Sequence, residues 1–120
     1  MESKELTIVI VTFMSESKLF SCLESIPKNI DVIIVENSNN KIFKNDIENK
    51  FQNTKCILTG ENKGYAAANN IGLKNVKTRY ALVLNPDAIL EKNAISNFLD
   101  TARKLENFWL IGPGNDQAKK

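Results

Sequence analysis

Leu6–Thr12 reads LTIVIVT, seven uncharged residues of which six carry a side chain branched at Cβ. A run that is apolar or β-branched at almost every position is typical of a strand buried on both faces of a parallel sheet. Parallel strands are joined by crossover connections, so helices cover both faces of such a sheet. This stretch therefore predicts an α/β protein.

The rest of the chain alternates between strand and helix patterns, as that fold requires. Apolar runs predict further strands at residues 31–35, 55–59 and 80–84, and a fifth at 108–111. Between them, apolar residues recur every three or four positions, which predicts helices. These are expected at residues 15–26, with Ser15 as N-cap and Pro27 as the stop, and at 43–51, 65–76 and 95–105. The apolar face of the last helix comprises Ile95, Phe98, Leu99, Ala102 and Leu105.

Strands that alternate with helices predict a Rossmann-like, mostly parallel sheet with helices on both faces. Right-handed crossovers would place the first and fourth strands side by side, where the direction of winding reverses. Ligands of such sheets bind beyond the carboxyl ends of the strands at that point. We therefore expect functional residues in the loops after Thr12, Val35, Thr59 and Leu84.

The length and composition of the chain exclude several kinds of partner, catalytic residue and metal site. With 120 residues the chain has room for one domain, and its net charge of +2 is too small to indicate a nucleic-acid partner. The absence of histidine excludes a histidine base, a Ser-His pair and a histidine metal site. Cys22 and Cys56 lie far apart within apolar runs and are interpreted as buried free thiols. The first residues are polar and unlike a signal peptide, so the cytoplasm is the expected location.

Several familiar functions of small α/β proteins lack their signatures here. The loop after the first strand, TFMSES at residues 12–17, has no glycine, so neither a dinucleotide-binding turn nor a P-loop is expected. A phospho-receiver domain needs acidic residues after its first strand and an Asp after its third, where this chain has Phe13-Met14 and Thr59-Gly60. Ser15 and Ser17 resemble a flavodoxin phosphate loop only faintly.

Acidic and amide side chains do follow two of the strands. Glu36 and Asn37 close the second strand, and Asn85 and Asp87 follow the fourth. A carboxylate at this edge can hold Mg²⁺ or Mn²⁺ together with substrate phosphates, and the metal would neutralise a diphosphate leaving group. Glu36 could accept a hydrogen bond from a pyrimidine N3–H or a ribose hydroxyl.

The start of the helix expected at residues 65–76 is another candidate region. Asn62 and Gly64 precede it, where free backbone N–H groups favour phosphates or sugar hydroxyls. Asn70 lies within the helix, an unfavourable position for asparagine, which favours a polar contact of its side chain.

Four short motifs, taken together and in this order, resemble the glycosyltransferases of family 2. They are VIVTF at residues 9–13, ENSN at 36–39, NKGYAAANNIG at 62–72 and LNPD at 84–87. The second is close to the family's Asp-Asn-x-Ser, with one change and a slip, and the third matches almost position for position. The fourth is similar to the variant of the metal-binding Asp-x-Asp in the rhamnosyltransferase-like branch. The resemblance runs from about Thr7 to Pro113.

The resemblance implies a GT-A-type fold and the transfer, usually with inversion, of a sugar from a nucleotide diphosphate donor to an acceptor hydroxyl. The donor would be UDP- or dTDP-linked and the acceptor a glycan or a lipid-linked glycan. The pathway would be polysaccharide or cell-surface glycan synthesis, in the cytoplasm or at the inner membrane face. Asp87, assisted by Asn85, would hold the divalent metal. The nucleotide-sugar would be bound by Thr12, Phe13, Glu36, Asn62, Gly64, Asn70 and Asn85.

Four of these residues also have ordinary structural roles. Asp87 could be a turn residue that caps the following helix, and Glu36 a solvated carboxylate at a strand end. Thr12 could be a core residue, and Phe13 could pack instead of stacking on a pyrimidine. These alternatives stay open at the level of the sequence.

Residues 1–113 are expected to form the nucleotide-sugar-binding domain, the N-terminal part of a longer catalytic domain, and residues 114–120 a tail. In the family the general base comes from the later half, so we expect it beyond Lys120 and identify none here. The chain could be part of an active enzyme, a non-catalytic or partner-completed module, or a domain used only for interaction. Apolar surface near Trp109 and Leu110 would favour self-association.

Overall fold

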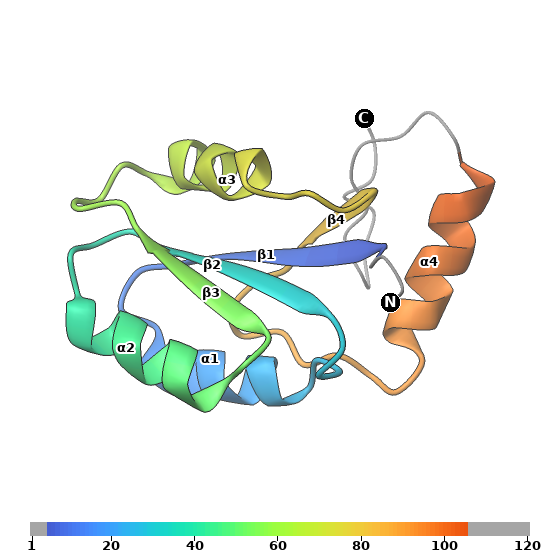
Figure 1. Cartoon of the computed structure of the whole chain (residues 1–120), viewed down its shortest axis with the longest axis horizontal. Coiled ribbons are helices and arrows are strands. Elements are labelled where there is room, and N and C mark those ends of the chain that lie inside the picture. The colour runs from blue at the N-terminus through green and yellow to red at the C-terminus, as the bar shows by residue number, and fades with distance from the viewer. Residues whose placement is uncertain (1–4, 106–120) are drawn as a thin grey trace.

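Figure 1 shows the computed structural model, which describes residues 5–105 apart from the side chain of Glu16. Strands and helices alternate throughout this range, which confirms the predicted α/β class. They are β1 (Leu6–Thr12), α1 (Glu16–Glu24), β2 (Asp31–Glu36), α2 (Lys41–Lys50), β3 (Thr54–Leu58), α3 (Tyr65–Lys74), β4 (Tyr80–Val83) and α4 (Ala94–Lys104). The predicted elements were correct in kind and shifted by at most two residues at an end. The predicted strand at 108–111, the tail and the surface near Trp109 lie outside the described residues.

The four described strands form one parallel sheet in the order β3-β2-β1-β4. β1 pairs with β2 up to Thr12 opposite Glu36, and with β4 from Leu6 opposite Tyr80. The predicted neighbourhood of the first and fourth strands is therefore confirmed, and the winding reverses between them.

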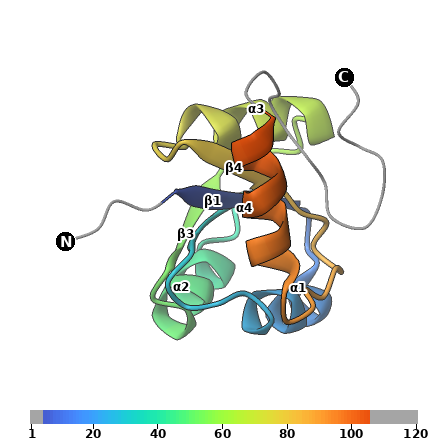
Figure 2. The same cartoon turned by 90° about the vertical axis from the view of Figure 1, so that its right-hand side faces the viewer.

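Helices cover both faces of this sheet. α1 and α2 lie on one face and α3 on the other, while α4 stands across the end of the molecule that faces the viewer in Figure 2. Phe98 and Ala102 of α4 join the core shared with α1 and α2, and Ile95 and Leu99 pack against it. Leu105 was wrongly predicted in this apolar face: it is the C-cap residue, where the helix has ended, and it is 49% exposed.

α3 approaches the sheet closely through two small residues. A Cβ on Gly72 would lie 2.6 Å from Cγ1 of Val9 and 3.0 Å from Cγ2 of Val35. Ala68, one turn earlier, is fully buried against the same face. These contacts hold α3 on β1 and β2, and they leave its N-terminus near the loops that follow the strands.

Two smaller predictions can be compared with the structure. Cys22 and Cys56 are buried free thiols, as expected. Ser15 occupies the N-cap position of α1, but its side chain makes no capping bond, because its hydroxyl donates to the carbonyl of Phe13 at 3.3 Å. Within residues 5–105, no helix has the length and apolar character needed to span a membrane.

Candidate functional site

Glu36, the last residue of β2, is completely buried. Its Oε1 accepts a hydrogen bond from the hydroxyl of Thr12 at 2.6 Å. Its Oε2 accepts one from the hydroxyl of Ser38 at 2.5 Å and a longer one from the backbone N–H of Met14 at 3.4 Å. The alternative of a solvated strand-end carboxylate is therefore wrong. Glu36 ties the loop after β1 to the loop after β2, and its contact with a nucleotide base stays a prediction.

The loop after β1 divides into a buried and an exposed part. Thr12 is buried, its hydroxyl is bonded to Glu36, and its carbonyl accepts the N–H of Asn37 at 2.8 Å. Phe13 is 50% exposed and Met14 67% exposed, so Phe13 does not serve as a core residue. Met14 has φ of 58°, the left-handed region, which costs a non-glycine residue on the order of 1–3 kcal/mol and is commonest at functional sites. This loop thus presents an aromatic ring beside a strained backbone position.

Asn37, which follows Glu36 but is not among the predicted site residues, bonds to a different segment. It is 3% exposed, and its Nδ2 donates to the carbonyl of Gly64 at 3.0 Å. Its Oδ1 accepts from the backbone N–H of Lys63 and from the hydroxyl of Thr59, each at 3.0 Å. The available signal was an amide directly after a buried strand, with a glycine-containing turn farther along the chain. Asn37 connects β2 to the segment that leads into α3.

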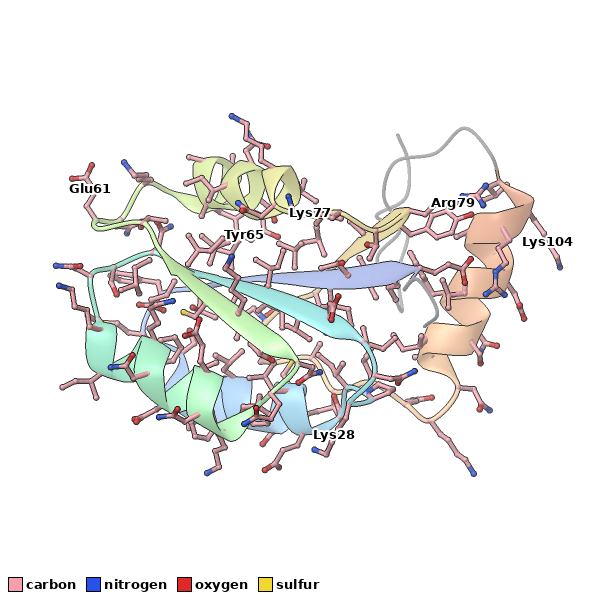
Figure 3. All side chains as sticks on the ribbon, in the orientation of Figure 1. Lys28, Glu61, Tyr65, Lys77, Arg79 and Lys104 are labelled. Carbon is pink, nitrogen blue, oxygen red and sulfur yellow. The ribbon has the colours of Figure 1, made fainter. Side chains whose placement is uncertain are left out.

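That segment, residues 59–64, turns at two glycines. Gly60 has φ of 91° and Gly64 φ of 88°, both in the region that favours glycine. Asn62 is exposed, and its Oδ1 accepts the N–H of Gly64 at 3.0 Å. Gly64 is the N-cap of α3, and no side chain from the described range caps the first N–H groups of the helix. In Figure 3, Glu61 points outward at the tip of this segment.

Asn70 is not brought to these loops. It is exposed, and it lies two residues from both Ala68 and Gly72, about 200° around the helix from the face on the sheet. The neighbouring Asn69 carries a buried Oδ1 that has no hydrogen-bond partner within residues 5–105. The phase of the helix therefore puts Asn70 on the outer side of α3.

Asn85 and Asp87 lie in the loop after β4. Asn85 Oδ1 accepts the N–H of Asp87 at 3.2 Å, and both side chains are exposed. Asp87 does not cap the following helix, because α4 begins at Ala94 with Asn93 as its N-cap. Burial, and then the negative charge of Asp87, raise the pKa of Cys22 to about 11, so this carboxylate acts electrostatically on α1. Within the described range no three His, Cys, Asp or Glu side chains cluster as metal ligands. The donors here are one carboxylate and one amide oxygen, which fit a hard cation that keeps other oxygen ligands.

A surface hollow of about 480 Å³ lies at the opposite, amino edge of the sheet. It is lined by Thr7, Asp31 and Thr54 at the strand starts, with Lys28 and Lys77, which Figure 3 labels, on either side. We place the candidate site at the carboxyl edge instead, because ligands of parallel sheets bind there and because the buried polar side chains converge there.

The chain has relatives among known proteins. The chain is 32% identical to the teichoic acid poly(glycerol phosphate) polymerase of Staphylococcus epidermidis, over 91% of this chain and 16% of that protein. It is 27% identical to the low-salt glycan biosynthesis hexosyltransferase Agl10 of Haloferax volcanii, over 91% of this chain and 36% of that protein. The chain thus spans well under half the length of these relatives.

The fold itself resembles a solved structure. The crystal structure of S. aureus TarS 1–349 matches 84% of this chain and 33% of that one, with a TM-score of 0.69 and 17% sequence identity. This likeness supports the predicted GT-A-like α/β fold. Residues 7–114, nearly the whole chain, match the sequence model of the family described as Glycosyl transferase family 2. The chain belongs to glycosyltransferase family 2.

Proposed function

We propose that the chain forms the donor-binding part of an inverting glycosyltransferase, which moves a sugar from a nucleotide diphosphate to an acceptor hydroxyl. The observation that carries this proposal is the network of buried bonds from Glu36 and Asn37. It joins the loops after β1 and β2 to the uncapped N-terminus of α3. An aromatic ring, a polar anchor and uncapped helix N–H groups at one edge of the sheet suit the base, the ribose and the phosphates of a nucleotide.

The roles of the individual residues follow from this arrangement. Phe13, half exposed, would stack on the base. Thr12 and Glu36, which bond to one another, would hold that loop and recognise the base or ribose. Asn62 and Gly64 would present the phosphates and the sugar to the start of α3. Asn70 has the least support in the proposed set, because it faces away from the sheet.

Asp87 would hold Mg²⁺ or Mn²⁺ in this proposal, with the amide oxygen of Asn85 beside it. A metal so bound neutralises charge on the diphosphate leaving group. Asn85 is uncharged, so Asp87 would be the principal protein ligand. The sequence Asn85-Pro86-Asp87 is the basis for proposing a rhamnosyltransferase-like branch.

The proposed donor is UDP- or dTDP-linked and the proposed acceptor a glycan or lipid-linked glycan, with no role for nucleic acid. One relative is named as a glycan biosynthesis enzyme and another as a polymerase, which favours polysaccharide or cell-surface glycan synthesis. The proposed site of action is the cytoplasm or the inner membrane face.

Isothermal titration calorimetry of this chain with UDP and with dTDP, each with and without Mn²⁺, tests the proposal. We expect binding of at least one nucleotide, tighter with Mn²⁺, while ADP serves as the control for base recognition. A folded sample that binds neither pyrimidine nucleotide would overturn the proposal for this chain.

A second candidate is a non-catalytic nucleotide-sugar-binding module, or one completed by a partner chain. It is raised by the candidate site itself, whose described residues offer contacts for a nucleotide and a metal but include no side chain identified as a general base. Incubation with a panel of UDP- and dTDP-sugars separates the two. Release of nucleotide in the presence of a glycan acceptor indicates an enzyme, and binding without release indicates a module.

A further inference from the structure

We propose that Asn37 is the positioning residue that sets the N-terminus of α3 at the donor site. This inference rests on the function proposed above and adds a side chain to which no role has been given. Asn37 does not need to touch the nucleotide, since it acts through the segment 59–64.

The backbone of Asn37 is held by the sheet. It directly follows Glu36, which is paired with Thr12 at the end of β1, and its own N–H donates to the carbonyl of Thr12 at 2.8 Å. The neighbouring peptide carbonyl of Glu36 accepts the N–H of Thr59 at 3.1 Å. Asn37 is therefore a fixed point from which a side chain can position something less rigid.

Both the nitrogen and the oxygen of the side-chain amide bond to the segment 59–64. Nδ2 donates to Gly64 O, and Oδ1 accepts from Lys63 N and Thr59 Oγ1, all at 3.0 Å. These bonds hold residue 59 at the start of the turn and residues 63 and 64 at its end. A buried amide is tolerated when its donor and acceptor are both satisfied, as here. An aspartate would keep the acceptor and lose the donor, and an alanine would lose all three bonds.

Apart from those of Asn37 and of α3 itself, the described bonds from outside the segment 59–64 are at its start, where the N–H groups of Thr59 and Gly60 donate to the carbonyls of Glu36 at 3.1 Å and Ser38 at 3.0 Å. Gly60 and Gly64 both adopt positive φ, and open space surrounds the position of a Cβ on either one. Asn62 bonds only within the turn, to the N–H of Gly64. α3 meets the sheet at Ala68 and Gly72, one and two turns farther along the helix. Within the described residues, the bonds that reach Lys63 and Gly64 from the end of β2 come from Asn37, so this side chain is placed to set the direction of the first N–H groups of α3.

Binding of an anion at a helix N-terminus depends on those N–H groups pointing at it. A small displacement of the start of α3 would weaken its hydrogen bonds to a phosphate, because such bonds depend on both distance and angle. Loss of the Asn37 bonds should therefore weaken nucleotide binding more than it weakens the fold. A purely structural asparagine would show the opposite pattern.

Asn53 is a matched control for this comparison. Its Nδ2 donates to the carbonyl of Ile30 at 2.7 Å, so it also joins two loops through an amide, but at the amino edge of the sheet. Asn53→Ala should lower thermal stability and leave nucleotide affinity within about twofold of wild type. Asn37→Ala should lower affinity for UDP or dTDP by about tenfold or more, the equivalent of one hydrogen bond to a charged group.

The experiment combines calorimetric titration of wild type, Asn37→Ala, Asn37→Asp and Asn53→Ala with amide hydrogen exchange of residues 59–66 without nucleotide. We expect faster exchange of that segment in both Asn37 variants, and weaker nucleotide binding in both. Asn37→Asp retains the acceptor and serves if Asn37→Ala does not fold. Wild type that binds, together with Asn37 variants that bind equally well or exchange equally slowly, overturns this inference alone. Wild type that binds no nucleotide overturns the proposed function, and this role with it.

Discussion

The hydroxyl of Thr12 donates a 2.6 Å hydrogen bond to Oε1 of Glu36, and the two residues lie opposite one another where β1 and β2 end. Both side chains are buried, so neither oxygen has water as an alternative partner. The bond closes the end of the sheet at the point where the chain turns into the loops of the candidate site.

Thr12→Val keeps the shape of the side chain and removes this donor. We expect the free energy of unfolding to fall by about 1–3 kcal/mol, because a buried carboxyl oxygen loses its partner. Urea denaturation measures the change. Thr12→Ser retains the hydroxyl and is the control, for which we expect a smaller loss of stability. A valine variant as stable as wild type would show that the bond does not stabilise the fold.

Gly72→Ala should destabilise the protein although alanine is the better helix former. The new methyl group would meet Val9 at 2.6 Å and Val35 at 3.0 Å, and overpacking of this kind costs about 1–3 kcal/mol. Val9→Ala in the same chain makes room for the methyl group, so the double variant should be more stable than the sum of the two single changes predicts. Thermal unfolding of the four proteins gives the answer, and a Gly72→Ala variant more stable than wild type would contradict this packing.

Asp87→Ala tests the proposed metal ligand. We expect nucleotide binding in the absence of Mn²⁺ to persist and the gain in affinity from Mn²⁺ to disappear. Loss of an outer-shell partner alone costs about 10- to 100-fold in metal affinity, so loss of the ligand should cost at least as much. Asp100→Ala, which removes an exposed carboxylate on α4, is the control. An unchanged response of Asp87→Ala to Mn²⁺ would exclude the role.

The two thiols predict a loss of stability at high pH. Burial raises the pKa of Cys22 to about 11 and that of Cys56 to about 12, from 9.0 for a free thiol. The thiols therefore ionise more readily in the unfolded state than in the folded state. Their contribution to the stability of the folded state is complete below pH 9 and is lost as the pH rises toward 11–12. For Cys22 the loss between pH 8.5 and 10.5 should be about 1–2 kcal/mol.

Urea denaturation across that pH range measures this effect. Cys22→Ala should show a shallower decline than wild type, since lysine and tyrosine titration is common to both proteins. A thiol reagent at pH 8 should label the folded protein slowly and the urea-unfolded protein fast. Parallel pH profiles of the two proteins would show that Cys22 is not the cause.

Much of the fold could be predicted because its signals are local. The run from Leu6 to Thr12 reports burial on both faces through its composition alone, and all seven of its residues are buried. The handedness of crossovers then leaves few sheet orders for four such strands, and β1 beside β4 is the result. The helix end at Leu105 was missed because fraying and capping depend on contacts beyond the periodic pattern.

For the candidate site, the sequence predicted the region but not the individual hydrogen bonds. The rule for strand ends directed attention to the end of β2, where Glu36 lies, and to the loop after β4, which contains Asp87. The bond between Thr12 and Glu36 depends on the register of two strands 24 residues apart, which no local pattern contains. The bonds from Asn37 to Lys63 and Gly64 also join residues far apart in the sequence, so no local pattern predicts them. The outward direction of Asn70 depends on which face of α3 meets the sheet.

The loop after β4 makes its described hydrogen bonds apart from the network of Glu36 and Asn37. Those of Asn85 stay within the loop, to Asp87 and Ala88, or come from the thiol of Cys22 on α1 at 3.8 Å. The carboxyl edge is therefore assembled from two mechanically separate parts. Substitutions around Asn85 should leave the hydrogen bonds around Asn37 intact, and the two halves of this edge can be altered one at a time.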